Sequence, residues 1–191
     1  MNDLLTDLPL VVDLDGSLIC SDLLVESAFA YLGDNPLHIF SLLYALRSGK
    51  AAIKSTIAAE TAIDVTQLPY DERVLELIAE ARARGRKIYI ASASAERYVI
   101  AVAEHVGADG YFASDRTTNL SRERKAECLV DAFGERGFDY VGNDTTDLPV
   151  WNVCRKGWAI HPPASARKAI AASCFDVDII PPPERTGPKL G

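Results

Sequence analysis

The sequence predicts an α/β protein, in which a parallel β-sheet has helices on both faces and a small helical insertion follows the first strand. Two observations carry this prediction. Short apolar segments alternate with amphipathic helical segments over residues 66–179, a pattern typical of a parallel sheet covered on both faces. Residues 21–65 interrupt this alternation, because their apolar side chains recur at helical spacing instead.

The first strand is expected at residues 8–12, an apolar run rich in β-branched side chains that leads into Asp13. Runs of this kind are typical of a buried parallel strand. Residues 21–65 contain breaks at 33–36 and 48–49 and fit two or three helices. We expect this insertion to form a cap over the carboxyl ends of the strands, where open α/β sheets bind ligands.

After the insertion, strands and helices are expected in regular alternation. The clearest helix, residues 71–84, is amphipathic and is followed by Gly85. Strands are then expected at 87–91, 110–113, 138–141, 157–160 and 174–177, and helices at 95–106, 122–133, 147–154 and 164–172.

These elements divide the chain into three parts. Residues 1–20 and 66–179 form the predicted α/β core, and residues 21–65 form the helical cap. Residues 180–191 are rich in proline and are expected to be a tail or linker.

The chain of 191 residues carries a formal net charge of −7. Its bulk charge therefore attracts neither nucleic acid nor an anionic membrane, and no nucleic-acid partner is expected. An acidic protein that handles phosphate needs a local device instead, such as a bound cation or a helix N-terminus.

The four cysteines are widely spaced and form no CxxC pair, which argues against a zinc site or a disulfide scaffold. Reduced thiols in a cytoplasmic protein are the expected state. No signal peptide is recognisable, and the longest apolar stretch, near residues 37–46, is far short of the ~20 residues that span a bilayer. We therefore expect a cytoplasmic protein.

Four groups of polar residues follow predicted strand ends, and the first contains Asp13 and Asp15. Two carboxylates two residues apart on an extended backbone face the same way and repel each other unless a cation lies between them. This suits phosphoryl transfer in which one aspartate attacks phosphorus and the other protonates the leaving oxygen. Gly16 permits the tight turn that follows. The alternative is an Asp-Gly turn whose aspartates are only caps.

The second group is Ser92, at the end of the strand expected at 87–91. Its hydroxyl can bind a phosphate oxygen, and the N-terminus of the next helix adds backbone N–H donors. The alternative is a helix-capping serine, although Ser94 fits that capping role better.

The third group is Lys125, near the start of the helix expected at 122–133. Its ammonium can neutralise a phosphate and keep the nucleophilic carboxylate ionised. Since Arg122 and Arg124 are neighbours, a solvated basic helix face is the alternative.

The fourth group is the loop 142–147, which contains Asn143, Asp144 and Asp147. Clustered oxygen ligands at a strand end suit Mg²⁺. The alternative is a turn with a helix N-cap at Thr146 or Asp147. All four groups are expected at one edge of the sheet, and this convergence favours phosphate chemistry over four unrelated caps.

In this order the residues resemble the haloacid dehalogenase (HAD) superfamily of phosphatases, over about residues 8–160. The run from Asp13 to Ser17 matches the family motif DxDG[TS], while Ser92, Lys125 and the loop 142–147 match its second, third and fourth motifs. The resemblance implies a Rossmann-like fold and an aspartyl-phosphate on Asp13.

The same resemblance implies roles for the other residues of the four groups. Asp15 would be the general acid and base and would also offer its backbone carbonyl to Mg²⁺. Ser92, Ala93 and Lys125 would bind the phosphate of a small phosphorylated substrate. The residues implied as metal ligands are Asp13, Asp15, Asn143, Asp144 and Asp147.

The insertion resembles the small helical cap of phosphoserine phosphatase-like members, which sequesters and selects the substrate. Asp22 and Glu26 are candidates for substrate contacts, with helix N-terminal charges as the alternative. Residues 137–151 and 22–26 are also similar to the HAD domain fused ahead of UbiA-type prenyltransferases. This similarity implies fusion to, or association with, a membrane prenyltransferase, so that the chain would be that protein's cytoplasmic domain.

One position departs from the family pattern. The fourth motif usually begins Gly-Asp, but here Asn143 follows the glycine, and an amide oxygen binds Mg²⁺ less strongly than a carboxylate does. The amide of Asn143 replaces the carboxylate as a weaker metal ligand, or Asp144 supplies the carboxylate one residue later, or the site is degenerate. Two functions therefore stay open, namely Mg²⁺-dependent phosphomonoester hydrolysis and a catalytically weak binding or regulatory module.

Two other classes of protein are disfavoured. A response-regulator receiver domain also surrounds an aspartyl-phosphate with acids, a hydroxyl and a lysine, but it has no cap after its first strand. A nucleotide-binding oxidoreductase would need a GxGxxG run after the first strand, which the sequence lacks.

Overall fold

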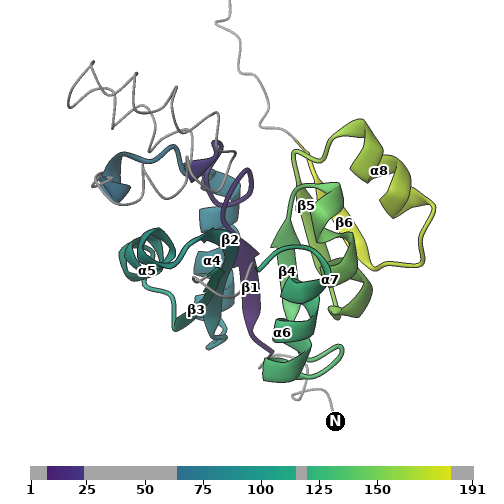
Figure 1. Cartoon of the computed structure of the whole chain (residues 1–191), viewed down its shortest axis with the longest axis horizontal. Coiled ribbons are helices and arrows are strands. Elements are labelled where there is room, and N and C mark those ends of the chain that lie inside the picture. Colours follow the sequence, from purple (N-terminus) through teal and green to yellow (C-terminus); the bar gives the residue numbers. More distant parts are fainter. Residues whose placement is uncertain (1–7, 24–63, 115–119, 182–191) are drawn as a thin grey trace, which may run out of the picture.

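The computed structural model describes residues 8–23, 64–114 and 120–181 of the chain. At its centre is a six-stranded sheet with the strand order β3-β2-β1-β4-β5-β6, in which every neighbouring pair is parallel (Figure 1). This is the order of a doubly wound α/β sheet, whose ligands bind where the strand order reverses, beside the first strand. The predicted parallel α/β architecture is confirmed.

The six strands are short, as expected for a buried parallel sheet. They are β1 (Leu10–Asp13), β2 (Ile88–Ala95), β3 (Gly110–Ser114), β4 (Asp139–Gly142), β5 (Gly157–Ile160) and β6 (Val177–Ile180). The prediction of the last strand at 174–177 is wrong by three residues. Its pairing with β5 begins where Gly157 N donates to Asp176 O, so the register of β5 determines where β6 starts.

Five helices cover the two faces of the sheet within the described residues. They are α4 (Glu72–Ala83), α5 (Glu96–His105), α6 (Glu123–Phe133), α7 (Leu148–Val153) and α8 (Ala164–Ala171), with short 3₁₀ helices at η2 (Val65–Gln67) and η3 (Thr145–Asp147). Buried side chains of α4 and α5 pack on one face, and those of α6, α7 and α8 pack on the other (Figure 1). Side chains of β1 alternate between the two clusters, with Val12 on the first and Val11 on the second.

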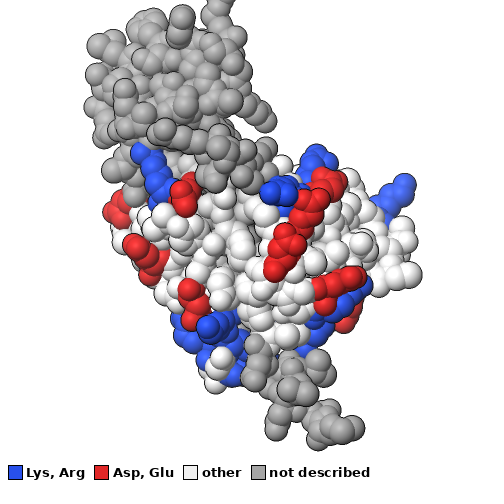
Figure 2. Space-filling model, turned by 60° about the horizontal axis from the view of Figure 1, so that its bottom comes forward, with Lys and Arg blue, Asp and Glu red and all other residues white. Residues whose placement is uncertain are grey.

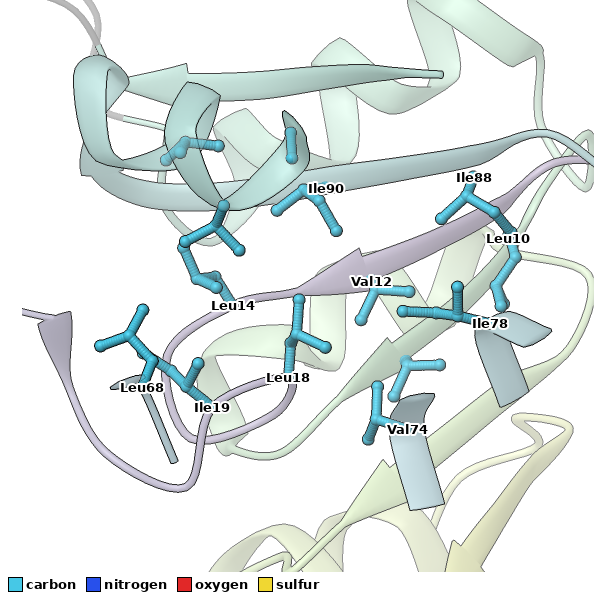
Figure 3. Packing of buried hydrophobic residues seen from close by; sticks show 14 of the residues in the cluster. Leu10, Val12, Leu14, Leu18, Ile19, Leu68, Val74, Ile78, Ile88 and Ile90 are labelled. Atoms are coloured by element: carbon cyan, nitrogen blue, oxygen red, sulfur yellow. The ribbon is translucent and has the colours of Figure 1, made fainter. Parts of the chain in front are cut away.

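The apolar core continues past the end of β1. Figure 3 shows side chains of β1, β2 and α4 packed together, with the loop that follows β1 closing the cluster. Leu14, Leu18 and Ile19 in this loop have no exposed surface. Fully burying such a side chain stabilises the fold by about 1.5–3 kcal/mol, so the loop that follows Asp13 and carries Asp15 is anchored by packing.

The two ends of the insertion lie side by side. Cys20 N donates to Pro69 O at 2.8 Å, and Asp71 N donates to Leu18 O at 2.9 Å. The predicted cap at 21–65 falls mostly on residues 24–63, outside the described residues, and stays a prediction. The same holds for the tail beyond Pro181, although Ile180, the first residue of that predicted tail, is still part of β6.

Charged side chains of both signs are mixed on the surface. On the face in Figure 2, acidic and basic groups lie close to one another around a largely uncharged centre. None of the described helices combines the length and apolar character that a membrane span requires.

A buried ion-pair cluster ties the start of β4 to its neighbours. Asp139 has no exposed surface and accepts from Arg86 Nη2 at 2.6 Å and from Arg155 Nε at 2.8 Å. Arg86 Nε also donates to Leu8 O at 2.6 Å, which links this cluster to the segment before β1. Arg86 therefore links the segment before β1 to the first residue of β4, and Arg155 adds a second ion pair at that residue.

We expect Asp139→Asn to lower the free energy of unfolding by about 3 kcal/mol, because Arg86 would be left nearly buried without its counter-charge. Urea denaturation followed by circular dichroism measures this loss. Asp178→Asn is the matched control, since Asp178 is exposed and pairs with Lys156 at 2.9 Å in solvent. Equal stability of the two variants would contradict the proposed importance of the cluster.

Candidate active site

The candidate site lies at the carboxyl ends of β1, β2 and β4. The register places Asp13 beside Ala91 and Val12 beside Val141, so the ends of β2 and β4 flank the end of β1. Side chains that are distant in sequence therefore meet at one edge of the sheet, as the sequence predicts.

Asp13 is buried and bonded to two side chains. Lys125 Nζ donates to its Oδ1 at 2.7 Å, and Ser17 Oγ donates to its Oδ2 at 3.0 Å. Burial raises the pKa of Asp13 to about 7; Lys125 opposes this rise, and the charges of Asp147 and Asp15 add to it.

Lys125 is 5% exposed, so the alternative of a solvated basic face does not hold for this side chain. Burial alone would lower the pKa of Lys125, but the carboxylates of Asp13 and Asp147 outweigh that effect and raise it. The side chain is therefore an ammonium held between two acids, at 2.7 Å from Asp13 and 3.5 Å from Asp147.

Asp15 is held by three donors. Ser92 Oγ and Ser94 Oγ both donate to its Oδ2, at 2.9 and 2.7 Å, and Leu23 N donates to its Oδ1 at 2.8 Å. The capping role expected for Ser94 is wrong, because α5 begins after Ala95 with no side-chain cap. Strand β2 instead continues past Ser92, and the spacing of two residues turns both hydroxyls toward Asp15.

Asp147 orients the loop that contains it. Its Oδ2 accepts from Asn143 N at 2.9 Å and from Asp144 N at 3.1 Å, while its Oδ1 accepts from Tyr140 Oη at 2.7 Å. Both oxygens are thus bonded to protein donors, and the residue is 1% exposed. This role differs from the direct metal ligation that the sequence predicts for Asp147.

Tyr140 is a site residue that the sequence analysis missed. Its fully buried hydroxyl accepts from Lys125 Nζ at 3.1 Å and donates to Asp147 Oδ1. Burial raises the pKa of Tyr140 well above its ordinary value, so the phenol is neutral. The only sign of this role in the sequence is that a tyrosine, with its polar hydroxyl, stands in a largely apolar strand two residues before that strand ends.

The loop 142–147 approaches the turn after Asp15 closely. Gly16 has φ +77°, and a Cβ at this position would lie 2.2 Å from Asn143 Nδ2. The positive φ favours glycine here, and any side chain at this position would also displace the Asn143 amide. This contact brings the amide of Asn143 onto the turn that follows the two aspartates.

Oxygen atoms at this edge are of the kind that could hold a magnesium ion. Asp13 and Asp147 lie 2.7 and 3.5 Å from Lys125, and the charge of Asp15 acts on Asp13. No three acidic, cysteine or histidine side chains in the described residues form a metal-binding group of their own. Magnesium requires no such group, because it takes one or two carboxylates with neutral oxygens and waters.

The remaining predicted site residues lie around this centre. Ala93 sits between the two serines in β2, and Asp144 is half-buried, with its Oδ1 accepting from Thr145 Oγ1 at 3.1 Å. Asp22 is exposed beside Leu23 at the start of the insertion. Glu26 lies outside the described residues.

No protein-family model matches the chain. The uncharacterized protein y4nM of Sinorhizobium fredii is 36% identical over 145 residues, which are 75% of this chain but 28% of that protein. The chain thus spans about a quarter of the length of this relative.

Solved structures resemble the chain over most of its length. A protein of unknown function from Bordetella pertussis Tohama I has a TM-score of 0.67 at 15% identity, covering 88% of this chain and 96% of its own. A HAD family hydrolase from Salmonella enterica serovar Typhi has a TM-score of 0.61 at 18% identity, covering 84% and 66%. A phosphoserine phosphatase in apo form has a TM-score of 0.62 at 14% identity, covering 91% and 93%. The chain therefore has the fold of the HAD-family hydrolases, phosphoserine phosphatases among them.

Proposed function

We propose that this chain hydrolyses a small phosphomonoester through an aspartyl-phosphate on Asp13, with Mg²⁺ as its cofactor. The observation that carries the proposal is the pairing of Asp13 with buried Lys125 at 2.7 Å, beside a second carboxylate, Asp15, held by two hydroxyls. Hydrolases and phosphoserine phosphatases among the structural neighbours support the same reaction class.

In the first step, a carboxylate oxygen of Asp13 attacks phosphorus in line, and the bond from phosphorus to the ester oxygen breaks. Asp15 gives its proton to the leaving alkoxide. Lys125, the hydroxyl of Ser92 and the backbone amide of Ala93 stabilise the charge on the phosphoryl oxygens. When Ser92 turns to the phosphate, Asp15 Oδ2 loses one of its two hydroxyl donors and gains room for a proton.

In the second step, Asp15 takes a proton from a water molecule whose oxygen attacks phosphorus. The acyl phosphate bond to Asp13 breaks, and inorganic phosphate leaves. Mg²⁺, held by Asp13, Asn143 and the backbone carbonyl of Asp15, would neutralise part of the charge on the transferred group. Lys125 then pairs again with the regenerated carboxylate of Asp13.

The proposal extends to the start of the insertion. Leu23 N bonds to Asp15 Oδ1 at 2.8 Å, so the first residues of the insertion contact the general acid directly. Substrate selection by the cap, with Asp22 and Glu26 as contacts, remains part of the proposal. So does a membrane prenyltransferase as fusion partner, in which case a polyprenyl-linked phosphate becomes a candidate substrate.

The alternative of a catalytically weak module rests on Asn143, where the family pattern has an acid. It is not favoured, because the nucleophile, the acid, the hydroxyl and the lysine are all brought together. This alternative requires that millimolar Mg²⁺ produce no heat of binding in calorimetry and no turnover.

We expect Asp13→Asn to abolish Mg²⁺-dependent hydrolysis of p-nitrophenyl phosphate, with a fall in kcat of about 10³-fold or more, because the amide is no nucleophile. EDTA should remove wild-type activity to the same level. Asp176→Asn is the matched control, since this exposed acid pairs with Lys156 at the far edge strand. Undiminished turnover by the Asp13 variant would show that another group is the nucleophile.

Replacing Asn143 by aspartate tests the metal assignment separately. We expect Asn143→Asp to lower the Mg²⁺ concentration for half-maximal binding by about tenfold, because a carboxylate adds charge to the ligand set. Isothermal calorimetry of the metal alone gives this value without any substrate. Asn152→Asp on the exposed side of α7 should leave it unchanged, and equal affinities for all three proteins would remove Asn143 from the metal site.

A further inference from the structure

We propose that Tyr140 is a positioning residue for this reaction: its hydroxyl satisfies Asp147 and thereby keeps the ammonium of Lys125 on the nucleophile, Asp13. The inference rests on the proposed function and assigns a role to a residue outside the four sequence motifs. It follows from the arrangement of three buried polar groups beneath the site.

The hydrogen-bond partners of Lys125 and Tyr140 determine which group donates in each bond. The Lys125 ammonium has only hydrogens to give, and it gives one to Asp13 Oδ1 at 2.7 Å and one to Tyr140 Oη at 3.1 Å. The phenol proton is therefore directed to Asp147 Oδ1, 2.7 Å away. The chain of donation runs in one direction, from Lys125 through Tyr140 to Asp147.

These hydrogen bonds determine which of two carboxylates, Asp13 or Asp147, binds the ammonium of Lys125 directly. Asp13 and Asp147 are both almost fully buried, and each attracts Lys125. The direct distance from Lys125 to Asp147 is 3.5 Å, longer than the 2.7 Å to Asp13. Because the phenol supplies a short hydrogen bond to Asp147, that acid does not need the ammonium as its direct donor.

Packing keeps the phenol in place. Tyr140 lies on β4 in the core cluster below α6 and α7, with no exposed surface. A Cβ at Gly142 would lie 2.8 Å from Tyr140 Cε1 and 2.7 Å from Asp147 Cγ, so ring and acid are enclosed from that side as well. Neither group can turn away without opening the core.

Removing only the hydroxyl should redirect the ammonium. In Tyr140→Phe the ring still fills the core, but Asp147 Oδ1 loses its donor inside the protein. The nearest donor is then Lys125, which should move toward Asp147 and away from Asp13. We expect kcat for p-nitrophenyl phosphate to fall about tenfold or more, with KM changed much less, because the ammonium matters most as charge develops during transfer.

Two comparisons separate positioning from a general loss of stability. Tyr89→Phe removes a hydroxyl from β2, two strands away from β4, where the ring packs against Phe112 and Phe133, and should leave kcat unchanged. The second comparison adds Tyr140→Phe to Lys125→Met. If Tyr140 acts through Lys125, the added change has no further effect on residual turnover, whereas a structural role would lower turnover in both backgrounds.

A crystal structure of the Tyr140→Phe protein tests the position of Lys125 without an activity measurement. We expect the distance from Lys125 Nζ to Asp13 Oδ1 to lengthen and that to Asp147 Oδ1 to shorten. Wild-type distances, or a wild-type kcat in this variant, would overturn the positioning role. Failure of the proposed function has a different signature, since the wild-type protein would then lack phosphatase activity while the shift of Lys125 could still be measured.

Discussion

The site depends on one buried ion pair, between the Lys125 ammonium and the Asp13 carboxylate. Either charge alone would be costly at this depth, since removing one partner of such a pair usually costs several kcal/mol. The pair places the proposed nucleophile and a cation 2.7 Å apart, where a phosphoryl group would need both. It also joins α6 to the end of β1 across the sheet edge, so it serves the fold and the proposed chemistry together.

Around this pair, the acids are held by hydroxyl groups and by backbone amides. Ser17 donates to Asp13, and Asp15 accepts from Ser92, from Ser94 and from the backbone amide of Leu23. Asp147 accepts from two backbone amides and from the phenol of Tyr140. Hydroxyls rotate easily and can change partners when a phosphate arrives, but backbone amides cannot. Two rotatable hydroxyls therefore bind Asp15 Oδ2, whereas two fixed backbone amides bind Asp147 Oδ2.

Much of this organisation could be predicted from the sequence, because apolar periodicity and strand ends are local properties. The strand before Asp13 and the meeting of Asp13 with Lys125 followed from the order of the segments. The roles of Ser94 and Tyr140 could not be predicted in this way. The role of Ser94 depends on the continuation of β2 past Ser92, and that of Tyr140 depends on which face of β4 packs against α6. The start of β6 was misplaced for a similar reason, since its register is determined by β5 and not by its own residues.

The contact between Leu23 N and Asp15 bears on how such proteins can be recombined. The paired segments 18–20 and 69–71 look like natural joints at which one insertion could be exchanged for another. A swap made there would nevertheless replace the residue whose backbone N–H donates to Asp15, the proposed general acid. Chimaeras that keep residues up to 23 should preserve the acid's surroundings and alter substrate choice alone, whereas cuts a few residues earlier should change both at once. The residues that surround Asp15 thus include the first residues of the predicted insertion, up to Leu23.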